Sequence, residues 1–327
     1  MSFSRREFLQ SGVALTAGLA TESGFSQTAW PEKPVRIING FGAGGASDVL
    51  TRLLAERLQA RFGQTFIVEN RTGAGGNISM EAVATAPPDG YTISSATIGT
   101  LTINQYLFAK LNYDPVKDFA YVSTFWENCN VFAVSKEHPA KTLQEWLAWA
   151  RKKPDGVTFS SSGVGTTPHL SGELFRLQTG IKATHVPFRG GPQAAPELAA
   201  GRIDFAIDNV ANQMPMLRSG KVKALAVTSS YRWQTLPDIP TMAEAGVPDF
   251  VVTSWGALVV PAGTPLAIVN KLAQAVQEIS KEPAMQEKFL TAGARFVSST
   301  PQEAAAFAAR ERVKWKEAVR VSGARVE

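Results

Sequence analysis

Short apolar runs alternate with amphipathic helical patterns along almost the whole chain from residue 35 onward. The clearest helical pattern covers residues 48–62, where the apolar side chains keep to one face and Gly63 supplies a helix stop. Such alternation is typical of an α/β protein with largely parallel strands covered by helices. The predicted strands are residues 35–39, 65–69, 92–97, 122–125, 131–135, 157–161, 184–188, 203–208, 224–228, 257–260 and 296–298.

The last part of the chain indicates how the molecule divides. Helical patterns near 265–280, 283–292 and 301–320 have a single predicted strand among them, so they need a sheet from elsewhere to cover. A chain of 327 residues is long enough for two ordinary domains. The economical arrangement has two lobes, each a mainly parallel sheet flanked by helices. We expect lobe 1 to be residues 30–127 plus 252–327, and lobe 2 to be residues 128–251.

Polar residues at four predicted helix starts are candidates for N-caps. Two capping boxes are present, the second with a proline at the first helical position. The candidates are Thr142 with Glu145, Thr300 with Glu303 and Pro301, Asp48 or Ser47 for the helix near 48, and Asn77 or Ser79 for the helix near 77.

The first 29 residues have the order of an export signal. Arg5 and Arg6 precede Phe8, and a short Ala/Gly-rich apolar segment follows at residues 12–20. That segment is far shorter than the ~20 apolar residues that span a membrane. The order resembles a twin-arginine signal, the alternative being the amphipathic start of a cytoplasmic protein. We therefore expect residues 1–29 to direct the protein to the periplasm.

Charge and cysteine content narrow the possible partners. The formal net charge is +5, but Arg and Lys are scattered without a run of five or more. This is unlike the clustered basic footprint of a nucleic-acid-binding protein and fits anionic ligands better. Cys129 is the one cysteine, so an internal disulfide and a C-x-x-C metal or redox site are excluded.

Two glycine-rich turns carry the strongest site signal. Gly40, Gly42 and Gly45 satisfy the pattern G-x-G-x-x-G after the first predicted strand, and the tripeptide Ala-Gly-Gly at 43–45 recurs at 74–76 after the second. Glycines let the backbone turn sharply, and a helix N-terminus presents free N–H groups and a positive dipole end to an anion. Because parallel strands open at the same sheet edge, we expect the two turns to grip one carboxylate together.

A dinucleotide site is the main alternative for the first turn. Glu69 ends the second predicted strand, close to where the ribose-binding acid of such a site belongs. Against this, Phe41 is bulky for its position between the glycines, and a pyrophosphate site would leave the second turn unexplained. Purely structural tight turns are a further alternative.

The second half of the chain has similar polar connections at strand ends. The segments at 161–175 and 185–198 each run from a predicted strand through a turn to a helix, and the segment at 201–209 is a strand that ends in Asp208-Asn209. In open α/β sheets, ligands bind at this edge. The pattern therefore predicts a cleft between the two lobes.

Several segments together resemble one known family. They are "WPEKPVRIINGFGAGGASDVLTRLLAERL", "VENRTGAGGNIS", "APPDGYT", "HLSGELF", "HVPFRGG" and "WGALVVPAGTP", within residues 30–325. Their order and spacing resemble the Bug-type receptors, the periplasmic solute-binding proteins of tripartite tricarboxylate transporters. The resemblance implies a two-lobe type II periplasmic binding protein, or Venus flytrap, that closes on a small ligand, usually a carboxylate.

The resemblance also implies where the ligand is held. In that family the two turns bind a carboxylate through backbone amides and bridging waters, and further contacts come from the strand ends. The ligand-binding residues expected on this basis are Phe41, Gly42, Ala43, Gly44, Gly45, Asp48, Gly73, Ala74, Gly75, Gly76, Asn77, Thr97, Ser162, Thr166, His169, Arg189 and Asp208. One departure is that Gly42-Ala43 stands where the family usually has a proline, so the local shape of the first turn is expected to differ.

Catalytic and metal motifs are not evident. The three histidines, His138, His169 and His185, are scattered, and neither H-E-x-x-H nor G-x-S-x-G occurs. Together with this absence, the resemblance implies a non-enzymatic, cofactor-free and monomeric receptor for a small organic carboxylate, working with the membrane subunits of a tripartite transporter or with a sensor. An exported nicotinamide or flavin oxidoreductase using Gly40, Gly42 and Gly45, and a hydrolase, are the alternatives. The same turns would serve many acids, so the ligand stays open.

Overall fold

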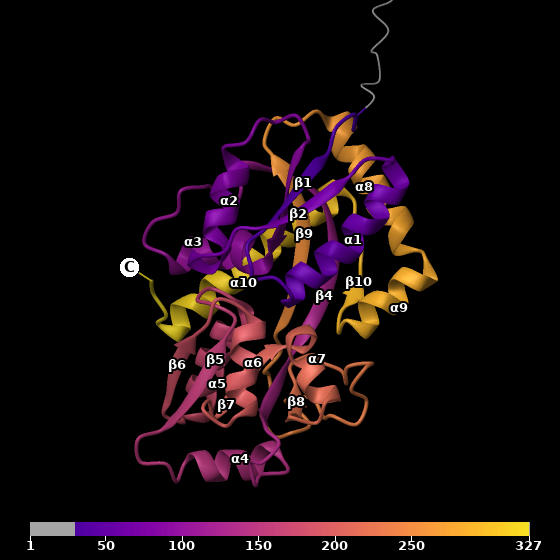
Figure 1. Cartoon of the computed structure of the whole chain (residues 1–327). Helices are drawn as coiled ribbons and strands as arrows, with labels where there is room; N and C mark the ends of the chain where they lie inside the picture. The colour runs from indigo at the N-terminus through magenta and orange to yellow at the C-terminus, as the bar shows by residue number, and fades with distance from the viewer. Residues whose placement is uncertain (1–29, 327) are drawn as a thin grey trace, which may run out of the picture.

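Two lobes joined by long strands make up the protein (Figure 1). The computed structural model describes residues 30–326, so the predicted export signal at 1–29 lies outside the described residues. The α/β class and the two-lobe arrangement predicted from the strand and helix pattern are confirmed. Within the described range, no helix combines the length and apolar character needed to cross a membrane.

Lobe 1, the upper lobe in Figure 1, is built on a mixed sheet in the order β2-β1-β3-β9-β4, with β10 added to β4. Strand β1 pairs in parallel with β2 and β3, whereas β9 runs antiparallel to both β3 and β4. The strands are β1 (Val35–Asn39), β2 (Phe66–Asn70), β3 (Thr92–Thr97), β4 (Phe119–Ser135), β9 (Thr253–Pro261) and β10 (Arg295–Phe296).

Helices cover both faces of this sheet. Successive residues of a strand point to opposite faces, so Ile37 packs with α1, α8 and α9 while Ile38 packs with α2, α3 and α10. The three predicted C-terminal helices therefore cover both faces of this sheet: α8 and α9 lie on one face and α10 on the other. Their bounds are α1 (Ala46–Phe62), α2 (Asn77–Ala84), α3 (Asn104–Leu107), α8 (Leu266–Ser280), α9 (Pro283–Thr291) and α10 (Pro301–Ser322).

Lobe 2 has its own sheet, in the order β6-β5-β7-β4, and β8 also pairs with β4. Strand β5 is parallel to β6 and β7, and the end of β4 is antiparallel to β7 and β8. Phe132, Trp146, Phe175 and Phe205 pack ring against ring in its core. The elements are β5 (Val157–Ser161), β6 (Ala183–Pro187), β7 (Phe205–Asn209), β8 (Val222–Val227), α4 (Leu143–Ala150), α5 (Thr167–Thr179), α6 (Gly191–Ala199) and α7 (Val210–Arg218).

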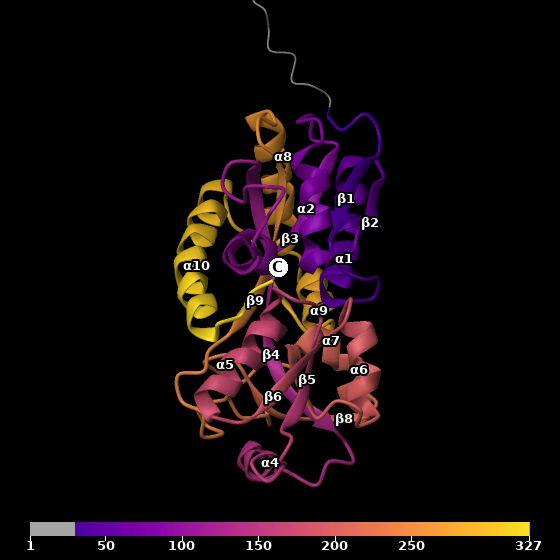
Figure 2. The same cartoon turned by 90° about the vertical axis from the view of Figure 1, so that its left-hand side faces the viewer.

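The strands predicted separately at 122–125 and 131–135 are one continuous strand, so that prediction was wrong. Strand β4 pairs with β9 from Phe119 to Cys129 and then with β7 and β8 from Asn130 to Ser135 (Figure 2). Polar residues at 127–130 interrupt the apolar pattern, yet Asn128 and Asn130 are fully buried and accept hydrogen bonds from the Asn209 amide. Pairing with distant strands therefore keeps residues 127–130 extended, although their local sequence pattern predicted the end of a strand.

One predicted capping box is complete and the other is partial. Thr300 accepts from the Glu303 N–H while the Glu303 carboxylate accepts from the Thr300 N–H, as predicted. At the start of α4, Thr142 accepts from the Glu145 N–H, but the Glu145 carboxylate accepts from the Lys141 N–H one residue earlier. The second half of that box is therefore displaced by one residue.

Candidate functional site

A cavity of about 40 Å³ lies where the two lobes meet. It is called the inner cavity below. Lobe 1 contributes the start of α1, the end of β3 and two residues of the crossing strands β4 and β9, and lobe 2 contributes the starts of three helices. The lining residues are Phe41, Gly45, Ala46, Ser47, Thr97, Ile98, Gly99, Trp126, Ser162, Thr166, Thr167, Pro168, Gly190, Gly191, Asn209, Asn212 and Ser254.

Four helices begin at this cavity. The N-cap residues Gly45 of α1, Thr166 of α5, Gly190 of α6 and Asn209 of α7 all belong to its lining. Among the described residues that line it, none carries a charged side chain. Since each helix N-terminus presents N–H groups and a partial positive charge, the converging ends favour an anion here. The electrostatics of the cavity therefore come from backbone and not from ionised side chains.

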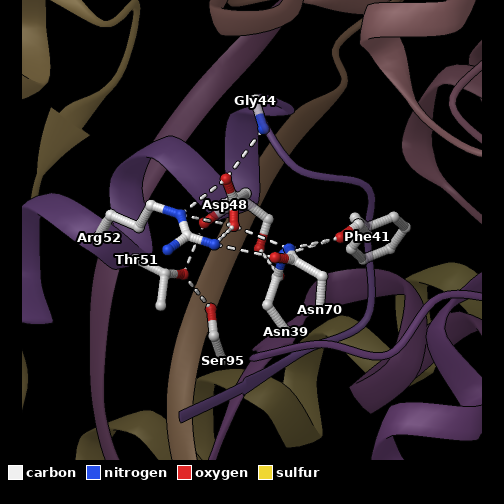
Figure 3. A network of polar contacts seen from close by, with 9 residues as sticks. Asn39, Phe41, Gly44, Asp48, Thr51, Arg52, Asn70 and Ser95 are labelled. Atoms are coloured by element: carbon white, nitrogen blue, oxygen red, sulfur yellow. Dashed lines mark hydrogen bonds and ion pairs between the residues drawn. The ribbon is translucent and has the colours of Figure 1, made fainter. Parts of the chain in front are cut away.

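The first glycine turn is held in shape by a polar network (Figure 3). The Asp48 carboxylate accepts from the Gly44 N–H (2.9 Å), the Asn70 amide (2.7 Å) and the Arg52 guanidinium (3.0 Å). The same Asn70 amide donates to the Phe41 carbonyl (2.8 Å). Burial opposes ionisation of Asp48, but these hydrogen bonds outweigh it and hold its pKa below the usual value. Asp48 thus positions the turn; it does not line the inner cavity.

The predicted side-chain caps of α1 and α2 are wrong. Neither helix has a side-chain hydrogen bond at its N-cap, which is Gly45 for α1 and Gly76 for α2. Asp48 instead reaches back to the turn, and the Ser47 hydroxyl donates to Asn39. The first turn of α1 therefore has no side-chain cap of its own, and its N–H groups are open to partners from elsewhere in the fold.

Asn212 supplies the partner that α1 lacks from its own sequence. Its Oδ1 accepts from the Ala46 N–H at 2.7 Å, which joins α7 of lobe 2 to α1 of lobe 1. Its Nδ2 donates to Ser162 Oγ and to Asp208 Oδ1, both at 2.9 Å. A carboxylate accepts only, so Asp208 fixes the orientation of the amide and directs the Asn212 oxygen toward α1.

Asp208, expected as a ligand contact, lies behind the cavity wall and is 1% exposed. Its Oδ1 also accepts from Ser162 Oγ (3.0 Å) and the Asn209 N–H (2.7 Å), and its Oδ2 accepts from Gln213 Nε2 (3.2 Å). Burial raises the pKa of Asp208, and these donors oppose the shift. With both oxygens occupied, Asp208 orients the wall residues and is not free to meet a ligand.

The two glycine turns, which we expect to grip one carboxylate together, border two adjoining spaces. The second turn borders a neighbouring space of about 500 Å³, called the outer cavity below. Phe41 and Ser162 line both spaces, and the Phe41 ring lies against Gly76. The residues of the outer cavity are Gly40, Phe41, Gly73, Ala74, Gly75, Gly76, Phe108, Ser162, Gly163, Val164, Pro187, Phe188, Arg189 and Val326.

The remaining expected contacts fall into three groups. Thr97, Ser162 and Thr166 line the inner cavity, and Arg189 lines the outer one. Gly42, Ala43 and Gly44 belong to the turn but line neither space. Asn77 lines neither space either: its Oδ1 accepts from Asn104 Nδ2 (2.6 Å) and from the Tyr113 hydroxyl (2.9 Å), so it joins α2 to α3.

His169 also lies outside both cavities. Its ring stacks on that of His185 at 4.2 Å, and its Nδ1 accepts from the Gly165 N–H at 3.4 Å. Burial lowers the pKa of His169 to about 4, and burial together with the neighbouring ring lowers that of His185 to about 3. Both rings are therefore neutral at pH 7, and His169 supports the loop at 163–165.

Part of the inner cavity wall was not predicted. Asn209 and Asn212 follow a strand end and open a helix, the same signal by which Ser162 and Thr166 were found, so this part could have been predicted. Trp126 and Ser254 lie within the long crossing strands, where no local pattern marks a site. The unpredicted lining residues are Ala46, Ser47, Ile98, Gly99, Trp126, Thr167, Pro168, Gly190, Gly191, Asn209, Asn212 and Ser254.

Glu69, the ribose acid of the dinucleotide hypothesis, is engaged elsewhere. Its two carboxylate oxygens accept from Arg36 Nε (2.6 Å) and Nη2 (2.8 Å), and Arg71 lies at 3.7 Å. Chiefly through the hydrogen bond from Arg36, this pairing holds the pKa of Glu69 below its usual value. It is not among the lining residues of either cavity. Over residues 30–326, His, Cys, Asp and Glu side chains nowhere form a group of three or more suited to a metal ion.

Comparisons with known proteins agree with this architecture. The family model for the tripartite tricarboxylate transporter family receptor matches residues 50–323. Protein BugT of Bordetella pertussis is 34% identical over 313 residues, which cover 95% of this chain and 95% of that relative. The structure of R. palustris Rpa4515 with adipate has a TM-score of 0.89 at 35% identity, covering 91% of this chain and 100% of that one. MatC from Rhodopseudomonas palustris with bound malate has a TM-score of 0.83 at 33% identity, covering 89% and 100%.

The two-lobe fold with a cavity at the lobe junction defines a periplasmic-type solute-binding protein. The chain belongs to the tripartite tricarboxylate transporter family of receptors. It is a solute-binding receptor of this family, as the resemblance implied. The alternative of an oxidoreductase has no support among the matched relatives.

Proposed function

We propose that the receptor captures a small organic carboxylate in the inner cavity. The observation that carries this proposal is the convergence of four helix N-termini, from both lobes, on a space lined by no charged side chain among the described residues. Adipate in Rpa4515 and malate in MatC are both carboxylates, which supports the same class of ligand here. We expect neither catalysis nor a cofactor to be required.

Closure of the lobes is the proposed working motion. Lobe 1 would comprise residues 30–127 plus 252–327, and lobe 2 would comprise residues 128–251. The crossing strands β4 and β9 would act as the hinge between them. The bond between Ala46 and Asn212 joins the lobes directly and supports a closed arrangement. A ligand that binds the closed form better shifts the receptor toward that form, which membrane subunits of a tripartite transporter would then recognise. We propose that the receptor acts as a monomer.

Binding should depend on the negative charge of the ligand. We expect dicarboxylates such as malate or adipate to bind at least tenfold more tightly than their diamides, because charge-assisted hydrogen bonds contribute roughly 1.5–3 kcal/mol each. Isothermal titration calorimetry on the mature protein tests this, after native mass spectrometry has identified any ligand that copurifies. Equal affinity for an acid and its diamide would rule out an anion site.

We further propose that residues 1–29 are a twin-arginine export signal, because Arg5 and Arg6 precede a short apolar segment. Changing both arginines to lysine should retain the protein in the cytoplasm, as fractionation and immunoblotting would detect. Export unaffected by this change would contradict the twin-arginine route and leave the receptor function in place.

A further inference from the structure

We propose that the end of lobe 2 farthest from lobe 1 docks the receptor on an anionic phospholipid surface. This end is called the basic end below and consists of the connections at residues 136–142, 151–156, 180–182, 200–204 and 219–221. The inference does not depend on the inner cavity. It adds to the proposed function a surface that holds the receptor at the membrane.

The fold brings these five connections together. They lie where β4 ends and where β5, β6, β7 and β8 begin, beside α4 at the bottom of Figure 1. The Lys136 N–H donates to the Lys221 carbonyl (3.1 Å), and the Lys182 carbonyl accepts from the first N–H of β5 (3.0 Å). Lys153 Nζ lies 2.8 Å from Asp204 Oδ1. Connections from separate parts of the sequence therefore form one surface.

Cations outnumber acids at the basic end. Its cations are Lys136, Lys141, Arg151, Lys152, Lys153, Lys182, Arg202 and Lys221, and its acids are Glu137, Asp155 and Asp204. Of the neighbouring elements, β8 adds Lys223, and the helices α4 and α6 add Glu145 and Glu197, so an excess of positive charge remains. These cations are scattered along the sequence, and the sheet of lobe 2 gathers them.

The lysines of the basic end are mostly unpaired. Four of them are exposed and, among residues 30–326, have neither an ion-pair partner nor a hydrogen-bond partner for the side chain: Lys136, Lys141, Lys152 and Lys221. The arginines are engaged within lobe 2, because Arg202 pairs with Glu197 and Arg151 donates to the Thr179 carbonyl. Lysine is a hydrated point charge on a flexible stem, whereas arginine suits fixed bidentate sites. Free lysines therefore fit a layer of lipid phosphates better than a shaped acidic segment of a protein.

The far end of lobe 1 has the opposite charge. There the connections that precede β1, β3 and β4 carry more acids than cations: Glu32, Asp89, Asp114 and Asp118 against Lys33 and Lys117. The receptor is therefore polarised along its long axis, with the positive end on lobe 2 (Figure 2). An anionic surface attracts the basic end and repels the other end, so it would orient the receptor with lobe 2 toward the membrane.

Vesicle co-sedimentation tests this docking on the mature protein, which lacks residues 1–29. The probes are vesicles that mix phosphatidylglycerol with phosphatidylcholine, and vesicles of phosphatidylcholine alone. We expect binding to the anionic vesicles only. Raising the salt from about 0.1 M to about 1 M should abolish it, because the screening length falls from roughly 10 Å to about 3 Å. Equal binding to both kinds of vesicle, or binding to neither, refutes the proposal and leaves an acidic protein segment as the alternative partner.

Charge variants locate the docking surface. Changing Lys136, Lys152 and Lys221 together to glutamine should lower the partition onto anionic vesicles at least ~20-fold, because each lysine near such a surface contributes about fivefold. Changing the same three residues to arginine should preserve binding. The matched control changes three exposed lysines of lobe 1 to glutamine and should alter binding less than about threefold, since they lie farther from the surface than the screening length: Lys110, Lys281 and Lys316. Equal losses in the two glutamine variants would assign the attraction to overall net charge and overturn the basic end.

Ligand binding separates this proposal from the proposed function. None of the substituted lysines lines the inner or the outer cavity, so each variant should keep the melting temperature and the ligand affinity of the unmodified receptor. A loss of ligand affinity in parallel with vesicle binding would contradict a role confined to docking. Vesicle binding by a receptor that takes up no carboxylate would support the basic end and overturn only the proposed function.

Discussion

Replacing Gly75 with valine is expected to weaken ligand binding at least a hundredfold while both lobes stay folded. Gly75 lies in the second glycine turn of lobe 1 with φ of +63°. A Cβ atom added there would lie 2.2 Å from the Val164 carbonyl oxygen, which belongs to the backbone of lobe 2. Because backbone cannot move aside as a flexible side chain can, the substitution should hold the lobes apart and prevent closure on the ligand.

The matched control is Gly63→Val. Gly63 ends α1 with φ of +68°, so valine meets the same left-handed backbone, but no atom lies within 4 Å of its added Cβ. Both variants should lose a similar amount of melting temperature, since the strain is the same in kind. Only Gly75→Val should lose affinity in calorimetry and the ligand-induced compaction in small-angle X-ray scattering. Parallel loss of affinity in both variants would refute the closure argument.

The glycine turns were predictable because their signal is local. A strand, a glycine-rich turn and a helix follow one another within about a dozen residues at each site, and the sheet then brings the turns to one edge. The same local logic placed residues 161–175 of lobe 2 at the cleft, and Ser162 and Thr166 of that segment line the inner cavity. The α/β class and the two lobes followed from the alternation of patterns along the chain.

The division of the cleft into two cavities was not predictable in this way. Phe41 was expected as a ligand contact and as too bulky for a dinucleotide turn, but not as a divider: in the fold its ring lies against Gly76 of the second turn and lines both spaces. Nothing local shows that two turns on adjacent strands will be separated by a side chain of one of them. The continuity of β4 is a similar case, because its pairing partners β7, β8 and β9 all lie far along the chain.

Asn212→Asp is expected to be the most damaging isosteric change at the inner cavity. It keeps an acceptor for the Ala46 N–H but places a carboxylate in the cavity wall, 2.9 Å from Asp208 Oδ1. A ligand carboxylate ~4 Å from the new side-chain carboxylate would be repelled by roughly 4 kcal/mol at an effective dielectric constant of about 20. Since ~1.4 kcal/mol is one decade of affinity, a carboxylate ligand should bind at least a hundredfold more weakly at pH 9. Asn212→Ala, which removes the hydrogen bond between the lobes without adding charge, should weaken ligand binding about tenfold.

The pH dependence of this loss identifies its cause. Two neighbouring carboxylates raise the pKa of one of them, so the Asp pair carries less negative charge at pH 6 than at pH 9, and the affinity loss should grow as the pH rises. Gln213→Glu is the matched control, because its amide also donates to Asp208 (3.2 Å) but does not line the cavity. It should lower the melting temperature as Asn212→Asp does and change affinity less than tenfold. Calorimetry at both pH values decides the matter: a loss in Asn212→Asp that does not depend on pH, or an equal loss in Gln213→Glu, would mean that the cavity does not hold its ligand as an anion.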